Sequence, residues 1–550
     1  MINVLKILLH KRNTFTIKKQ ILFIFIIVFY YIFSLNHIIQ GGIFYDDWSL
    51  TVGFLSDLTF EDKFKDLVLK TFLTRPIGGI YLTILTELGK NDYLYIFINS
   101  SFWLISSYII VNSLDCVLGE NSKKLILLTL LFPSFASTMI FSPVTQTLGV
   151  MSIFFWSISL LFSKKKRYSL SIIFFIISVL TYELSIVLLL FNIFLLIENN
   201  SKKNVLKNFV KTSLIFLLIT FGIIIFQFLI TKITGYTGSL KYAFFIENNK
   251  IIFEEDFFIN VKKYFFKPII LIFYDIPNLF FRSVFFFKIN IVSIFFPIIF
   301  LLLIILKIQD DSNITSSKGR LYLLSFCICL SIIGVFLVYL IVSSVPQVNG
   351  YYNRGLVGLF ICFALFIGLI FETKLKNLNY NFIKNSFIVI IVFFNFLSFQ
   401  VQQQNHITAN KVRDKILSKF VNFSKKNDEM LILTFIPTYV DNNYNDEVIF
   451  SEEVEDLFFA VRYKTKKKVI AGRIYNDKKC KKVFEIEDNR ISGFVTSKNR
   501  KYKDKTKHVF YKFSNTNRDI YLFKENKFIK LSYENNANFK ILSKHLGCKI

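Results

Sequence analysis

The sequence predicts a polytopic α-helical membrane protein with a small polar domain at its C-terminal end. Of its 550 residues, 53% are hydrophobic and 18% are aromatic, and the mean hydropathy is +0.49. Apolar runs of about 20 residues, the length that crosses the hydrocarbon core of a bilayer, recur through most of the chain. Such runs are expected to be helices, because a helix satisfies its own backbone polar groups in lipid.

The first segment sets the orientation that we expect. Residues 1–20 carry only basic charges, so the positive-inside rule keeps them in the cytoplasm. The run from Ile21 to Ile39 then crosses outward as a retained signal anchor, since it is long and lacks a small-residue cleavage site. Residues 40–92 therefore form the first external loop.

The positions of the basic loops determine which later segments we expect to cross the membrane. The stretch from Arg75 to Leu88 is short, and a crossing there would put the later basic loops outside, so we expect a helix lying on the outer interface. Lys267 to Phe287 is expected to be half-buried in the membrane. Span length and loop charge together give about eleven crossings: Ile21–Ile39, Tyr93–Asn112, Leu125–Phe141, Leu148–Phe162, Ser169–Tyr182, Leu184–Ile197, Thr212–Ile230, Ile289–Leu306, Leu321–Ser343, Gly355–Phe371 and Phe382–Leu397.

The composition changes near Val401, which divides the chain into a membrane domain, 1–400, and a polar domain, 401–550. The second part contains runs typical of strands, separated by turn-rich polar stretches. We expect a small α/β or mostly-β domain. An odd number of crossings places it outside the membrane. The strand-like runs are Glu429–Thr434, Lys468–Ala471, His508–Phe513 and Ile520–Phe523.

The formal net charge is +28, from 66 Lys and Arg against 38 Asp and Glu. On a membrane protein this indicates cationic cytoplasmic loops and attraction to anionic lipids and phosphates. Nucleic acid is not an expected partner, because no basic helix or aromatic platform organises the charge. P-loop, dinucleotide-binding and Ser-His-Asp patterns are absent. Ionisable residues are nearly missing from the middle of the predicted spans, which disfavours an ion-coupled transporter.

The first candidate site is the acidic pair Asp46-Asp47, a few residues beyond the first span. Two adjacent carboxylates repel each other, and near hydrocarbon an ionised carboxylate needs a compensating metal, cation or substrate proton. One interpretation is a general base that takes a proton from an acceptor hydroxyl. The other is an N-cap for a helix beginning at Trp48. Both readings are compatible if the acids divide the roles; Asp46 is then the preferred base.

Arg75-Pro76 heads the expected interfacial helix, since Pro is a helix-start residue. Arg75 is predicted to bind a phosphate bidentately or to pair with the acidic pair, with a headgroup-contacting Arg as the alternative. Gln146 lies in the short external stretch Ser142 to Thr147, which faces the same site or is a plain turn. Glu183 lies between two predicted spans, where a carboxylate indicates function unless it reaches the interface or bonds to Arg or Lys.

A later external loop ends in Tyr351-Tyr352-Asn353-Arg354, just before a predicted span. A guanidinium at that depth suits a lipid-linked phosphate, with the two tyrosine rings against a sugar or a prenyl chain. The alternative is an interfacial anchor belt. The sequence leaves open whether a divalent metal such as Mg²⁺ or Mn²⁺ is bound.

The order Asp46-Asp47, Arg75-Pro76, Phe132-Pro133 to Thr147 and Leu180-Thr-Tyr-Glu183 resembles the GT-C class of membrane glycosyltransferases. Within that class it resembles the bacterial serotype-converting glucosyltransferases that decorate O-antigen. The resemblance covers roughly Ile21 to Ile197 and is one of layout. It departs from the family at Val144 to Thr147, where members often carry a further acidic residue.

The resemblance implies that Asp46 or Asp47 activates an acceptor hydroxyl and that external basic residues hold the phosphate of a polyprenyl-phosphate sugar donor. The expected function is transfer of a sugar to a cell-surface glycan on the periplasmic face of the bacterial inner membrane. An O-antigen polymerase and a lipid-linked oligosaccharide flippase are the alternatives.

Overall fold

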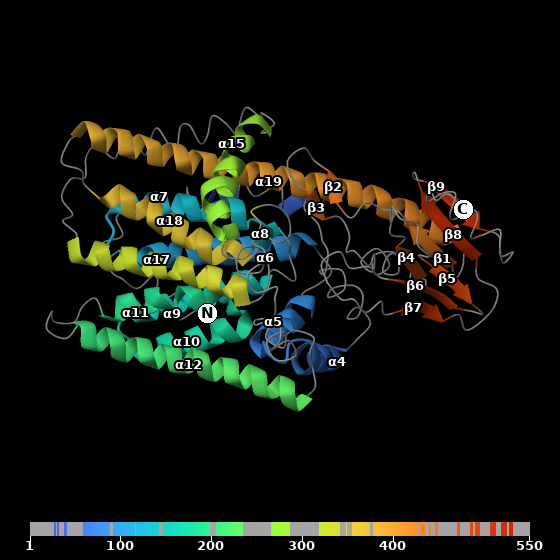
Figure 1. Ribbon diagram of the computed structural model, residues 1–550, viewed down its shortest axis with the longest axis horizontal. Coiled ribbons are helices and arrows are strands. Elements are labelled where there is room, and N and C mark those ends of the chain that lie inside the picture. The colour runs from blue at the N-terminus through green and yellow to red at the C-terminus, as the bar shows by residue number, and fades with distance from the viewer. Residues whose placement is uncertain are drawn as a thin grey trace. The chain divides into compact units, whose positions relative to one another are not determined.

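The computed structural model describes the membrane-like part of the chain in long helices and the C-terminal part in short strands (Figure 1). The described residues fall in two compact units that divide within helix α19, between Ile407 and Thr408. The sequence analysis placed this division near Val401. The structure describes residues 27–28, 30–31, 38–40, 59–87, 92–115, 117–141, 147–197, 205–234, 266–286, 318–341, 348, 355–373, 378–426, 430–434, 439–441, 446–448, 470–473, 484–487, 490–494, 507–512, 519–524 and 527–531.

Five of the described helices are long and apolar enough to cross a membrane, which is compatible with the predicted helical membrane class. These five helical stretches are Leu94–Ser113, Thr147–Lys164, Phe266–Phe285, Gly319–Tyr339 and Ile383–Lys425. Four further apolar helices are shorter: Tyr168–Thr181, Glu183–Ile197, Thr212–Gln227 and Val357–Glu372. The predicted crossing Ile289–Leu306 and most of Ile21–Ile39 lie outside the described residues.

The helices of the first unit follow the sequence prediction at most of their ends, because their boundaries coincide with polar or basic residues. Their bounds are α4 Phe60–Phe64, the π-helical segment η2 Lys65–Thr71, α5 Pro76–Glu87, α6 Asp92–Ser113, α7 Glu120–Leu131, the 3₁₀ segment η3 Ser134–Ala136, α8 Thr138–Phe141, α9 Thr147–Lys164, α10 Tyr168–Thr181, the 3₁₀ segment η4 Glu183–Leu188, α11 Leu189–Ile197, α12 Val205–Thr234, the π-helical segment η6 Leu271–Asp275, α15 Ile276–Phe286, α17 Lys318–Ile341, α18 Val357–Glu372 and α19 Leu378–Lys426.

Three predicted segments differ from the structure. The crossing expected from Leu125 to Phe141 is interrupted after α7, because Pro133 has no N–H with which to continue the helix. The crossing expected from Leu184 begins as the 3₁₀ segment η4, since the chain enters it from Tyr182 in an extended conformation. The helix expected to end at Leu397 continues to Lys426, because residues 398–426 contain neither Pro nor Gly.

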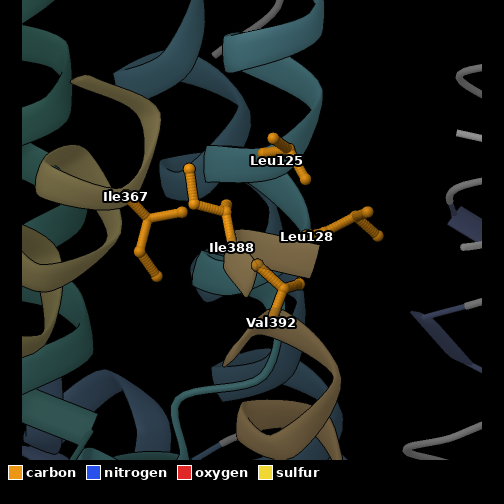
Figure 2. Packing of buried hydrophobic residues seen from close by; sticks show 5 residues of the cluster. All are labelled: Leu125, Leu128, Ile367, Ile388 and Val392. Carbon is orange, nitrogen blue, oxygen red and sulfur yellow. The ribbon is translucent and has the colours of Figure 1, made fainter. Parts of the chain in front are cut away.

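The core of the first unit lies between helices that are far apart in sequence. Leu125 and Leu128 of α7 pack with Ile367 of α18 and with Ile388 and Val392 of α19; Figure 2 shows the three helices from which these side chains come. Burying each of them contributes about 1.5–3 kcal/mol to stability. The C-terminal half of α18 is thereby held against α7 and the first half of α19.

The outer faces of several helices carry large apolar side chains that remain exposed within the described structure. Leu218 and Phe221 of α12, Tyr322 of α17 and Phe387 of α19 are each more than 60% exposed. A soluble protein rarely exposes apolar faces of this extent. These faces suit contact with lipid.

The second unit contains the part of α19 from Thr408 onward and nine described strands in three sheets. β1 lies at the centre of a four-stranded sheet of order β4-β1-β8-β9, parallel to β4 and β8. Four strands overlap the runs for which strands were predicted. The bounds are β1 Met430–Thr434, β2 Tyr439–Asp441, β3 Asp446–Val448, β4 Ile470–Arg473, β5 Phe484–Glu487, β6 Arg490–Phe494, β7 Lys507–Lys512, β8 Asp519–Lys524 and β9 Lys527–Leu531.

Candidate functional site

The central feature of the candidate site is a bidentate ion pair between Arg75 and Glu183. The Arg75 Nε donates to Glu183 Oε1 at 2.9 Å, and Nη2 lies 2.8 Å from Oε2. The two side chains are only 14% and 16% exposed. The guanidinium carbon also lies 4.5 Å from the centre of the Tyr182 ring. Paired hydrogen bonds and a stacked ring fix the guanidinium in one orientation.

The sequence around Arg75 brings it to this position. Pro76 is the first residue of α5, as expected of a residue whose missing N–H costs nothing in the first turn. Gly78 lies against the end of α10, because a Cβ at this position would be 2.8 Å from the Thr181 carbonyl oxygen. The absence of a side chain therefore lets α5 lie directly against the end of α10, beside Tyr182 and Glu183.

Gln227 of α12 is a member of the site that the sequence analysis missed. Its Nε2 donates to the Thr74 carbonyl at 2.8 Å and lies 3.5 Å from Glu183 Oε1. Gln227 is 1% exposed. Gln227 is the single amide in the apolar part of α12, residues 212–231, and this signal was present in the sequence, because an amide in such a segment needs a hydrogen-bonding partner.

A second chain of hydrogen bonds joins α5 to α9 and α6. The Tyr81 hydroxyl and Thr147 Oγ1 are 3.1 Å apart, and Thr147 Oγ1 donates to Asn99 Oδ1. Burial raises the pKa of Tyr81 to about 12, although its hydrogen bond with Thr147 opposes the shift. Thr147 is the last residue of the predicted external stretch and the first of α9. The stretch thus ends within this hydrogen-bonded layer.

We call this end of the first unit, marked by Arg75, Asn99, Thr147 and Glu183, the Arg75 end.

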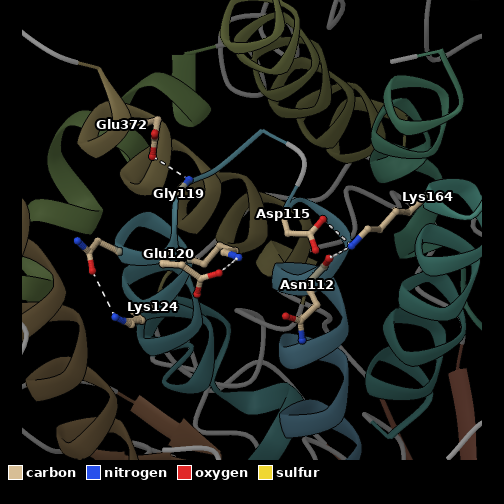
Figure 3. A network of polar contacts seen from close by, with 9 residues as sticks. Asn112, Asp115, Gly119, Glu120, Lys124, Lys164 and Glu372 are labelled. Atoms are coloured by element: carbon tan, nitrogen blue, oxygen red, sulfur yellow. Dashed lines mark hydrogen bonds and ion pairs between the residues drawn. The ribbon is translucent and has the colours of Figure 1, made fainter. Parts of the chain in front are cut away.

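A separate polar network joins the opposite helix ends (Figure 3). Lys164 of α9 lies 2.5 Å from Asp115 after α6 and donates to the Asn112 carbonyl at 2.6 Å. The helices α6 and α9 therefore both run from the Arg75 end to this network.

The same network fixes the direction of α7 relative to α18. The N–H of Gly119, which precedes α7, donates to Glu372 Oε2 at 3.0 Å (Figure 3), and Ser122 Oγ donates to the same oxygen at 2.5 Å. A carboxylate at the N-terminus of α7 accepts hydrogen bonds from N–H groups that have no partner within the helix, and its charge interacts favourably with the positive end of the α7 dipole. The last turn of α18 therefore meets the first turn of α7, and the two helices are antiparallel.

The predicted site residues divide into two groups. Arg75 and Glu183 are described, and the structure brings them together. Glu183 has the Arg partner that was the alternative to a direct role with substrate, and this contact occupies two donors of the Arg75 guanidinium. Asp46, Asp47, Gln146, Tyr351, Tyr352 and Arg354 lie outside the described residues.

Among the described residues, no group of three or more His, Cys, Asp or Glu side chains is arranged to hold a metal ion. No protein-family model, no curated protein and no solved structure matches the chain.

Proposed function

We propose that this chain is a GT-C-type glycosyltransferase of the bacterial inner membrane. It moves a sugar from a polyprenyl-phosphate donor to a cell-surface glycan, such as O-antigen, on the periplasmic face. In this proposal about eleven helices cross the membrane, the N-terminus is cytoplasmic, and the C-terminal α/β domain is periplasmic and orients the acceptor.

The observation that carries the proposal is the meeting of Arg75, Tyr182 and Glu183 at one end of the helices. These residues come from two of the four sequence segments on which the resemblance to the GT-C class is based. Tyr31, a described residue of the first predicted span, contacts α6 near Asn99, because its hydroxyl lies 2.6 Å from Ser101 Oγ and its ring stacks on Phe97.

The proposed reaction is an inverting displacement. The acceptor hydroxyl oxygen attacks the anomeric carbon of the sugar, the bond from that carbon to the phosphate oxygen breaks, and polyprenyl phosphate leaves. Asp46 or Asp47 takes the hydroxyl proton. Arg354, with Tyr351 and Tyr352 beside it, stabilises the charge that grows on the departing phosphate.

Arg75 has a more specific place in this scheme than the sequence suggested. Its pairing with Glu183 leaves a nearly neutral unit beside Tyr182 at the head of α5. We propose that this unit holds the interfacial helix in place and lends hydrogen-bond donors to the donor phosphate. Gln146, in the loop before Thr147, contacts the same substrate.

A flippase is supported less well. Such a protein needs polar or charged groups along a central path, whereas in α6, α9, α10 and α18, four of the described helices, any Asp, Glu, Lys or Arg residue lies at a helix end. A polymerase that joins whole repeat units remains the nearer alternative, since it also acts outside on lipid-linked sugars.

The test is the composition of the cell-surface glycan with and without the gene. The proposal expects one side sugar to disappear on deletion; shortened chains indicate a polymerase and retained intracellular intermediates indicate a flippase. Asp46→Asn and Asp47→Asn, singly and together, are then expressed in the deletion strain. At least one is expected to abolish the modification.

The matched control is Glu61→Gln, which removes a charge from an exposed acid of the same predicted external loop. Within the described part of the chain, Glu61 forms an ion pair with Lys65 on its own helical stretch. It is expected to leave the modification unchanged. If all three aspartate variants reach normal membrane levels and modify the glycan as the wild type does, the base assignment is wrong.

A further inference from the structure

The interruption between α7 and α8 is a stabilised feature of the fold. Pro133 removes the N–H that would bond to the Thr129 carbonyl four residues earlier. The Nδ2 of Asn395 in α19 donates to that carbonyl at 3.2 Å and to the Phe132 carbonyl at 2.8 Å. Trp103 Nε1 of α6 donates to the Leu130 carbonyl at 2.7 Å. Side chains of two other helices thus replace the lost backbone donors.

Backbone breaks of this kind carry information about function. Within a membrane bundle, interrupted helices are tolerated only where protein or water satisfies the freed polar groups, and they commonly surround binding sites. Here the break turns the chain into the short helix α8, Thr138–Phe141, whose residues are all buried. The next described residue in the chain is Thr147, which belongs to the Arg75 end.

The face of α19 that contacts this break carries a row of polar and aromatic residues. Asn395, Phe399, Gln402 and His406 follow the helical spacing of three and four residues, so they share one face. The rings of Phe399 and His406 lie 5.1 Å and 4.8 Å from the ring of Phe141. Gln402, which lies between Phe399 and His406 along this face, is fully buried.

Ser398 adjoins this row, because Ser398, Gln402 and His406 are spaced four residues apart and so share one side of the helix. Ser398 is fully buried, and among the described residues its hydroxyl has no hydrogen-bond partner. A buried hydroxyl without a partner costs about 1–3 kcal/mol. The row therefore offers a hydrogen-bonding group that a ligand can satisfy.

The charge of the surrounding sequence indicates the kind of ligand. No Asp, Glu, Lys or Arg occurs from residue 385 to 410 of α19 or from residue 125 to 163 around the break. A charged group in this layer lacks a counter-charge from either segment and is disfavoured. Hydroxyl, amide and imidazole groups can both donate and accept hydrogen bonds, which matches the hydroxyl groups of a sugar.

We propose that Ser398, Gln402 and His406, beside α8, bind the hydroxyl groups of the sugar carried by the polyprenyl-phosphate donor. The sugar identity is thus determined by residues of α19, which are distinct from the charged ones assigned to the phosphate and the proton. The assignment to the donor sugar rests on the proposed function, whereas the preference for an uncharged hydroxylated group rests on these residues.

The test measures binding of the full-length chain, purified in detergent, to polyprenyl-phosphate glucose, galactose and mannose and to polyprenyl phosphate without a sugar. The wild type is expected to bind at least one sugar-bearing lipid more tightly than the bare phosphate. Gln402→Met and His406→Phe keep the approximate side-chain volume and remove hydrogen-bonding groups. Each is expected to lower that preference by about three- to tenfold without changing affinity for the bare phosphate.

Gln404→Met is the matched control, because Gln404 lies on a different face of the same helix and is only half-buried. It is expected to keep the preference of the wild type. Equal binding of all lipids by the wild type overturns the proposal, as do variants that lose thermal stability yet keep the preference. Transfer activity is measured separately. If the wild type transfers sugar but the variants keep its lipid preference, the sugar site alone is refuted. If the lipid preference depends on these residues but the wild type transfers no sugar, the proposed reaction alone is refuted.

Discussion

The Arg75–Glu183 pair permits a quantitative test of the candidate site by a double-mutant cycle. Arg75→Met and Glu183→Met each remove one charge and leave the other in a place where both side chains are less than one-fifth exposed. Removing one partner of a buried ion pair typically lowers the unfolding free energy by about 3–5 kcal/mol. Because this pair is partly exposed, we expect a loss at the lower end of that range, about 3 kcal/mol. The double variant leaves no unpaired charge, so it is expected to cost about 3 kcal/mol rather than the sum of about 6 kcal/mol.

The assay is equilibrium unfolding of the purified chain in mixed micelles of rising SDS content, followed by circular dichroism. A control cycle uses Glu61→Gln and Lys65→Met, an exposed pair on one helical stretch, for which a coupling of about 0.5 kcal/mol or less is expected. If the costs of Arg75→Met and Glu183→Met add without coupling, the two side chains do not form the pair described above, and the geometry of the site is refuted.

Three further predictions concern the surroundings of the site. Asn395→Leu leaves the Phe132 carbonyl buried without its side-chain donor and is expected to lower the unfolding free energy by about 2–4 kcal/mol, measured in the same micelles; a loss below about 0.5 kcal/mol contradicts this role. Gly358→Leu is expected to destabilise by about 1–3 kcal/mol, since even a Cβ would lie 2.8 Å from Val187 Cγ2; an unchanged melting temperature would exclude this tight packing. Burial raises the pKa of Tyr81 to about 12 in the folded chain, against an ordinary value of 10.0. Between these two pH values the folded state binds more protons than the unfolded state. The unfolding free energy therefore falls with rising pH, by up to about 1.4 kcal/mol per pH unit. Tyr81→Phe removes that part of the fall, which pH-dependent unfolding of the two proteins measures; identical pH dependence refutes the shift.

The helices were the part of the fold that the sequence predicted best. Helix α6 runs from Asp92 to Ser113 against an expected span from Tyr93 to Asn112, and α9 and α10 agree equally well. These segments are apolar throughout and are bounded by polar or basic residues, so local sequence decides their limits. The predicted end of α19 was wrong, because a change from apolar to polar composition was interpreted as the end of a helix.

The candidate site was predicted only in part. Arg75 and Glu183 were both identified as unusual charges near apolar segments, yet their pairing depends on how closely α5 approaches α10. Gln227 was missed, because its partners, the Thr74 carbonyl and Glu183, belong to segments more than 40 residues earlier in the chain. The replacement of backbone donors by Asn395 and Trp103 was likewise not visible in the sequence.

The sequence by itself determined the class of protein, most helix limits and the types of residue at the candidate site. These follow from properties of short segments: hydrophobic length, the polar and basic residues that bound the apolar runs, and the cost of a charge near lipid. The tertiary structure alone decided which side chains meet. The Arg75–Glu183 pair spans 108 residues, and such a contact depends on side-chain packing between helices, where the lack of a Cβ at Gly78 sets the distance of approach.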